Sequence, residues 1–200
     1  DHNGIIVLPN DVPVGTPAAE YYHITNDYII EVDITPNRID GASHLGVARD
    51  LAAYLSQKQD IHYTLPSVDD FKVDSNTAGL TIEVQCPEAC IRYAGICIEG
   101  VKVQESPEWL QAHLKAIGHN PINNVVDVTN FILFELGQPL HAFNKDKIKG
   151  NKVIVRSFPT GTKFTTLDGV EWSLDENDLM ICTTEEPMCI AGGFGGVVSG

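Results

Sequence analysis

The order in which helical and strand patterns follow one another is the feature that most constrains the fold of this chain. Apolar residues recur with helical spacing in three segments, 43–55, 106–118 and 124–136. Strand patterns occupy 28–38 (broken at Pro36), 80–86, 91–103, 151–158, 162–167, 170–174, 178–183 and 187–196. Because these elements interleave without a regular β-α-β rhythm, the sequence predicts an α+β fold rather than a doubly wound sheet.

Short local signals support the element boundaries. Ser43 is a favourable N-cap for the first helix. Gly137 supplies a stop for the third helix, and Pro139 prevents that helix from resuming. Asp168-Gly169 lies between two strand patterns and predicts a tight hairpin.

Composition excludes several classes of protein. The chain is 43% hydrophobic, enough for a sizeable core, and 13 Lys and Arg stand against 27 Asp and Glu, giving a net charge of −14. That balance argues against a broad nucleic-acid-binding surface. No apolar run approaches the roughly 20 residues that a membrane span needs, so no membrane association is expected. We identify no signal peptide, and the first residues suggest a piece of a longer protein.

The cysteines indicate a reducing compartment rather than a disulfide framework. Their number is odd and their spacing is scattered, which is typical of cytosolic thiols. Cys86 and Cys90 in "CPEAC" resemble half of a zinc site, but no second pair has suitable spacing. We therefore expect no metal site and interpret these residues as ordinary buried thiols.

Basic residues gather in one part of the chain. Six of the 13 lie within 145–163, where Asp146 is the only acidic residue. This cluster is either a solvated lysine loop or a small patch that steers phosphate groups. In the second interpretation its first members would contact the phosphate groups of a ligand: Lys145, Lys147, Lys149 and Lys152.

The segment "DVTNFILFELGQPLHAF" combines a helix with polar groups at both ends. Thr129 and Asn130 are placed near the amino end, where free N–H groups can stabilise an oxyanion. His141 follows the helix and can titrate near neutral pH, so it could position or deprotonate a water. From spacing alone, capping, packing and structural roles are the more common explanation of these residues.

The glycine-rich "AGGFGG" at 191–196 lacks the Gly-Lys-Ser/Thr ending of a phosphate-binding loop. Such a turn is either structural or lets a ligand approach the backbone closely. No Ser-His-Asp order, zinc-protease motif or pair of catalytic carboxylates is recognisable. Hydrolysis by this chain would therefore use a positioned water rather than a side-chain nucleophile.

Four motifs occur in an order that resembles the beta subunit of bacterial phenylalanyl-tRNA synthetase. They are "DITPNRIDGASHLGVARDLAAYL", "NNVVDVTNFILFELGQPLHAF", "KFTTLDG" and "AGGFGG". The resemblance implies an extended connecting segment over 1–75 and a B3/B4-type domain over 76–200, with helices packed on layered mixed sheets. It also implies a cytoplasmic enzyme, an alpha subunit as partner, and ATP and magnesium on that subunit, with no cofactor in this chain.

The family's B3/B4 module is an editing site, which hydrolyses tyrosine wrongly esterified to tRNA(Phe). The resemblance assigns a catalytic role to His141, Asn130 and Thr129, and a substrate-binding role to Ala191 and Gly192. The acceptor end of the tRNA would then be the ligand, and the lysine cluster that begins at Lys145 would contact the same tRNA. A site that hydrogen-bonds the tyrosine hydroxyl rejects phenylalanine, which would leave its polar groups unpaired.

The chain departs from the family pattern at three places. Asn120, which we also expect on the substrate side of the site, replaces the usual Arg before "PINN". Gly193-Phe194 replaces the usual Val-Met or Val-Ile. The family's editing glutamate is expected in a strand beyond Gly200. These departures keep an alternative open, in which the chain is a non-catalytic architectural module; a free-standing editing protein is a second alternative.

Overall fold

The computed structural model describes residues 5–22, 24, 27–77 and 79–197, and the remaining residues of the two expected domains lie outside it. Contacts divide the chain into one unit up to Asp33 and a second from Ile34 onward. The second unit includes residues 34–75, because a helix in this range packs on a later one. The expected domain boundary at 75–76 concerns where the B3/B4-type domain begins, and it stays a prediction.

The first unit contains one short helix, α1 (Ala18–Tyr21), with no buried residue. The strand expected from residue 28 is absent among the described residues, so this prediction is wrong. The side chains of Tyr28 and Ile30 are 93% and 80% exposed. An extended segment forms a strand only where a neighbouring strand satisfies its N–H and C=O groups, and a sequence pattern does not supply that neighbour.

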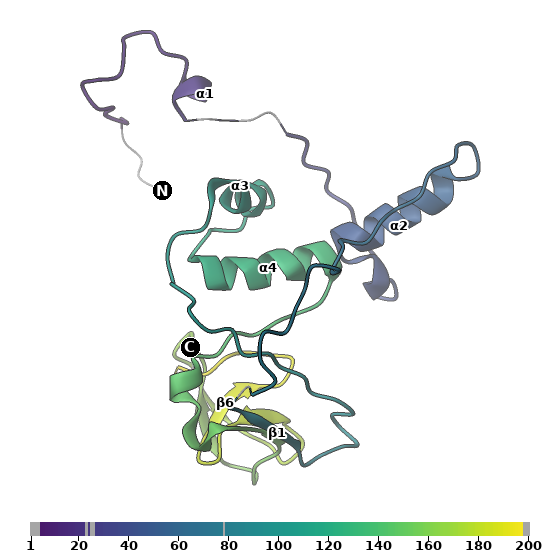
Figure 1. Ribbon diagram of the computed structural model, residues 1–200, viewed down its shortest axis with the longest axis vertical. Helices are drawn as coiled ribbons and strands as arrows, with labels where there is room; N and C mark the ends of the chain where they lie inside the picture. Colours follow the sequence, from purple (N-terminus) through teal and green to yellow (C-terminus); the bar gives the residue numbers. More distant parts are fainter. Residues whose placement is uncertain (1–4, 23, 25–26, 78, 198–200) are drawn as a thin grey trace. The chain divides into compact units, whose positions relative to one another are not determined.

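The second unit contains a four-stranded mixed sheet, which lies in the lower part of Figure 1. Its strands, in spatial order, are β1 (Thr81–Val84), β2 (Lys152–Arg156), β5 (Met180–Cys182) and β6 (Pro187–Ile190). The first pair is parallel and the other two pairs are antiparallel. This arrangement confirms the predicted α+β class with a mixed sheet.

A two-stranded hairpin, β3 (Lys163–Thr165) and β4 (Glu171–Ser173), adds a second sheet. Gly169 in its turn has φ of 80°, a left-handed conformation that glycine adopts without steric cost. The Asp168-Gly169 hairpin prediction is therefore confirmed.

Both faces of the larger sheet are covered by apolar side chains. Val153 and Ile181 enter one cluster, and Ile154 and Met180 enter the other, as alternating directions along a strand require. We call these the first and second core clusters. The first contains Ile148, Val153, Ile181, Met188 and Cys189, and the second contains Ile154, Phe164, Leu174, Met180 and Cys182.

The three predicted helices are confirmed as α2 (His44–Leu55), α3 (Glu108–Ala116) and α4 (Asn124–Leu136). The Ser43 hydroxyl accepts a hydrogen bond from Gly46 N–H at 3.0 Å, as an N-cap should. Gly137 ends α4 with φ of 75°. Both α2 and α3 contact α4. Short 3₁₀ turns are η1 (Ile39–Gly41), η2 (Lys145–Lys147) and η3 (Lys149–Asn151).

Segment 91–103 is extended but joins no strand ladder in the described structure, so the predicted strand is wrong. Tyr93 packs against the first core cluster, but most apolar residues of the segment are exposed, among them Ile96 and Ile98, each 69% exposed. The apolar pattern therefore corresponds neither to strand pairing nor to burial.

Asp127 ties the start of α4 to the preceding segments. Its side chain is fully buried and accepts hydrogen bonds from the Ser106 hydroxyl at 2.5 Å and from Ile122 N–H at 2.8 Å. The sequence pattern of the segment 127–143 does not indicate a role for Asp127. Its burial with two donors identifies it as a structural anchor.

We expect Asp127→Ala to lower the free energy of unfolding by about 3 kcal/mol, because a buried hydroxyl and a partly buried N–H lose their acceptor. Urea unfolding followed by circular dichroism measures this loss. Asp146→Ala removes an exposed carboxyl and serves as the control, with an expected change within about 0.5 kcal/mol. Equal effects of the two substitutions would contradict the anchoring role.

Candidate functional site

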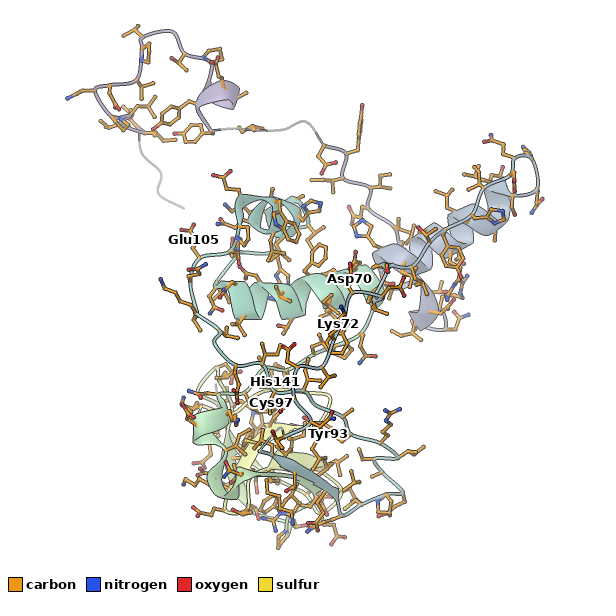
Figure 2. The ribbon with its side chains drawn as sticks, in the orientation of Figure 1. Asp70, Lys72, Tyr93, Cys97, Glu105 and His141 are labelled. Carbon is orange, nitrogen blue, oxygen red and sulfur yellow. The ribbon has the colours of Figure 1, made fainter. Side chains whose placement is uncertain are left out.

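His141 lies on the connection that leads from α4 to the strands, and Figure 2 labels its side chain there. Its ring is tilted by 46° against the ring of Phe143, with centroids 4.3 Å apart. Although the residue as a whole is exposed, burial of the ring lowers the pKa of His141 below its ordinary value. The neutral imidazole, which can accept a proton, therefore predominates at pH 7.

The glycine-rich loop is a tight turn that follows β6. Ile190 N–H donates to the Phe194 carbonyl at 3.0 Å, and Gly193 N–H donates to the Ile190 carbonyl at 2.9 Å. Gly192 has φ of 73° at the turn, and it is exposed. Ala191 packs against the first core cluster. The turn therefore presents an uncovered backbone on a fixed base.

His141 meets this loop at Gly195. A Cβ atom on Gly195 would lie 2.9 Å from Cε1 of His141 and 3.0 Å from Cδ1 of Leu167. Leu167 N–H also donates to the Gly195 carbonyl at 2.9 Å. The absence of a side chain at this position thus allows the imidazole to lie against the loop.

Gly195 and Leu167 belong to the site but were not predicted as site residues. The second glycine pair of "AGGFGG" is the sequence signal that could have indicated Gly195. It was not distinguished from the first pair, which contains Gly192. Leu167 carried no signal, because a single leucine before a hairpin turn is ordinary.

Thr129 and Asn130 do not lie near the amino end of α4, and this expectation is wrong. The helix begins at Asn124, so both residues are in its middle, and Asn130 is about 10 Å along the axis from the helix end. The Asn123 side chain already accepts from Val125 and Val126 N–H. The amino end therefore has its own cap.

No hydrogen bond or ring contact joins Thr129 or Asn130 to His141 within the described ranges. The Thr129 hydroxyl instead donates to the Val126 carbonyl of its own helix at 2.7 Å. Asn120 is exposed in the connection between α3 and α4. The structure thus brings His141 together with the loop that holds Ala191 and Gly192, and the roles assigned to Thr129, Asn130 and Asn120 stay predictions.

Acidic residues from distant parts of the chain pair with the lysine cluster. Lys145 lies 2.9 Å from Glu99, and Lys149 lies 3.1 Å from Glu186. Lys152 pairs with Glu83 on the neighbouring strand. These carboxylates raise the pKa of Lys145 and Lys149, which remain charged. The cluster is therefore less positive than its local sequence indicates, and its contact with tRNA stays a prediction.

A pocket of about 210 Å³ lies away from His141, between α2, the segment after it and the end of α4. It is lined by His44, Leu45, Ala48, Tyr63, Thr64, Pro66, Glu135 and Leu136. In the described part of the chain, no group of three His, Cys, Asp or Glu side chains could hold a metal ion. Over the same residues, no helix combines the length and hydropathy needed to cross a membrane.

Comparison with known sequences now identifies the family. A profile of the B3/4 domain matches residues 89–200, more than half of the chain. The chain belongs to the B3/4 domain family. This result confirms the resemblance and agrees with the α+β fold of the domain.

The B3/4 chain is also similar to the phenylalanine–tRNA ligase beta subunits of several bacteria. Identity is 58% over 200 residues with the subunit of Bacteroides fragilis, and 58% over 201 residues with that of Bacteroides thetaiotaomicron. It is 43% over 196 residues with that of Fusobacterium nucleatum. Each match covers 98–100% of this chain but only 24% of the relative, so the chain spans about a quarter of their length.

Adding a methyl group at Gly195 tests the contact with His141. We expect Gly195→Ala to move the imidazole, shift its NMR resonances and cost about 1–3 kcal/mol, because two side chains must make room. Gly192→Ala is the matched control. It has no atom within 4 Å of its Cβ but a positive φ, so it should cost about 1 kcal/mol without moving the resonances of His141. Unchanged resonances in Gly195→Ala would refute the contact.

Proposed function

We propose that this chain is part of a phenylalanine–tRNA ligase beta subunit and that its B3/4 domain hydrolyses tyrosine wrongly esterified to tRNA(Phe). One observation carries the proposal. The imidazole of His141, which burial keeps neutral, borders Gly195 of the glycine-rich loop, and the exposed Gly192 of the same loop has no atom within 4 Å of where its Cβ would lie. The names of the relatives support the proposal that the chain is part of a ligase subunit.

The chemistry needs a water, a base and an open backbone. The oxygen of the water attacks the ester carbonyl carbon, and the bond from that carbon to the ribose oxygen breaks. His141 takes a proton from the attacking water and returns it to the departing ribose oxygen, so the histidine ends unchanged. The turn at Gly192 admits the aminoacyl end close to the backbone.

Selectivity for tyrosine fits a general limit on apolar pockets. Such a pocket rejects an added hydroxyl only by about a hundredfold, so a second site that hydrogen-bonds the hydroxyl improves accuracy. The proposed editing site would perform this second selection on tyrosyl-tRNA. Its partners would be the acceptor end of the tRNA and a cytoplasmic alpha subunit that holds ATP and magnesium.

The runner-up is an architectural module without editing activity. The separation of Thr129 and Asn130 from His141 favours it, since the three expected catalytic groups do not meet among the described residues. Hydrolysis by the complete enzyme distinguishes the two functions, because an architectural module would leave tyrosyl-tRNA intact.

We expect His141→Ala in the complete enzyme to slow deacylation of tyrosyl-tRNA(Phe) by about 10²–10⁴-fold, the usual contribution of a general base. Release of radiolabelled tyrosine measures the rate, and charging with phenylalanine should be unchanged. His113→Ala, which removes an imidazole from α3, is the control and should edit normally. If His141→Ala and Asn130→Ala both edit at the normal rate, the assignment of these residues fails.

Reversal of two lysines tests the tRNA contact. We expect Lys147→Glu with Lys149→Glu to weaken tRNA-dependent editing and to lower the slope of log KM against log salt by about 0.7–0.9 per lost phosphate contact. Lys58→Glu with Lys72→Glu makes the same change in net charge elsewhere. An equal effect of both double variants would show that only net charge matters, and the contact would be rejected.

A further inference from the structure

We infer that Phe143 is a positioning residue that holds the imidazole of His141 against the glycine-rich turn. The catalytic part of this inference rests on the proposed editing function, whereas its geometric part does not. Phe143 is two residues beyond His141, and their rings are 4.3 Å apart between centroids. No comparison assigns a role to this residue.

Among the described residues, His141 has no hydrogen-bond partner that would orient its ring. A functional histidine is normally oriented by a hydrogen bond from one ring nitrogen to a carboxylate or carbonyl. Within the described ranges, no hydrogen bond reaches a ring nitrogen of His141, and its ring contact is with Phe143. Packing must therefore do what a hydrogen bond does elsewhere.

Phe143 is itself anchored in the core. Its half-buried ring packs on the first core cluster, which includes Met188 and Cys189 of β6. Ala191, at the start of the turn, packs on the same cluster. Cys189 also pairs with Gly195 across the turn in an antiparallel bridge. One rigid cluster thus supports both the ring that orients His141 and the loop that His141 touches.

The imidazole of His141 lies in a partly buried environment. Burial is the cause that lowers the pKa of His141, and no charged neighbour contributes. The ring of Phe143 lies over one side of the imidazole and shields it from water. A smaller, non-aromatic side chain would expose the imidazole and loosen its orientation together.

The test compares the same substitution at two aromatic residues. Phe143→Leu removes the ring contact, and Phe158→Leu is the matched control. Phe158 packs on the second core cluster, and Cζ of Arg156 lies 4.7 Å from the centroid of its ring. We measure the pKa of His141 by NMR titration of the chain, its thermal unfolding, and kcat and KM for tyrosyl-tRNA deacylation by the complete enzyme.

We expect Phe143→Leu to raise the pKa of His141 toward about 6.5, the value of an unperturbed histidine. The kcat should fall about tenfold or more, with KM within about twofold, since misplacement of a base affects the chemical step. Phe158→Leu should lower stability similarly but leave the titration of His141 unchanged.

An unchanged His141 titration in Phe143→Leu, or an equal shift in both variants, would overturn the inference. If the titration shifts but the parent enzyme does not release tyrosine, the positioning holds and the proposed function fails. Should Phe143→Leu not fold, the wild-type chain still provides a test. Its His141 Hε1 resonance should carry a ring-current shift from Phe143, and a random-coil position would reject the stacking.

Discussion

The approach of an imidazole to a glycine backbone is the constraint on which the candidate site depends. Gly195 has no Cβ, and the space that this atom would fill is bordered by His141 and Leu167. The loop can be so close only because β6 and the returning segment are held by backbone pairing at Cys189 and Gly195. The missing side chain of Gly195 thus depends for its effect on the position of β6 in the larger sheet.

Helix boundaries and the hairpin were predictable because their signals are local. Ser43 and Gly137 act within one turn of the backbone, and Asp168-Gly169 forms its turn without help from the rest of the chain. Strands were predictable only in part. Segments 28–38 and 91–103 have strand patterns, but pairing needs a partner that no local pattern encodes.

The site was predictable to the extent that the motifs resembled a known family. His141, Ala191 and Gly192 were recognised in this way, and the structure brings His141 to their loop. Phe143 and Gly195 could not be assigned from spacing, because their importance comes from contacts in space. The lysine cluster illustrates the same limit, since its carboxylate partners, among them Glu83 and Glu99, are remote in sequence.

The candidate site requires His141 to lie close to the glycine-rich loop, and NMR can observe that proximity directly. In the wild-type chain, a nuclear Overhauser effect should connect Hε1 of His141 with the Hα protons of Gly195, because Cε1 borders the space beside that glycine. Clear cross-peaks between these protons are the predicted result. Their absence, with the cross-peaks between His141 and Phe143 retained, would contradict the central claim.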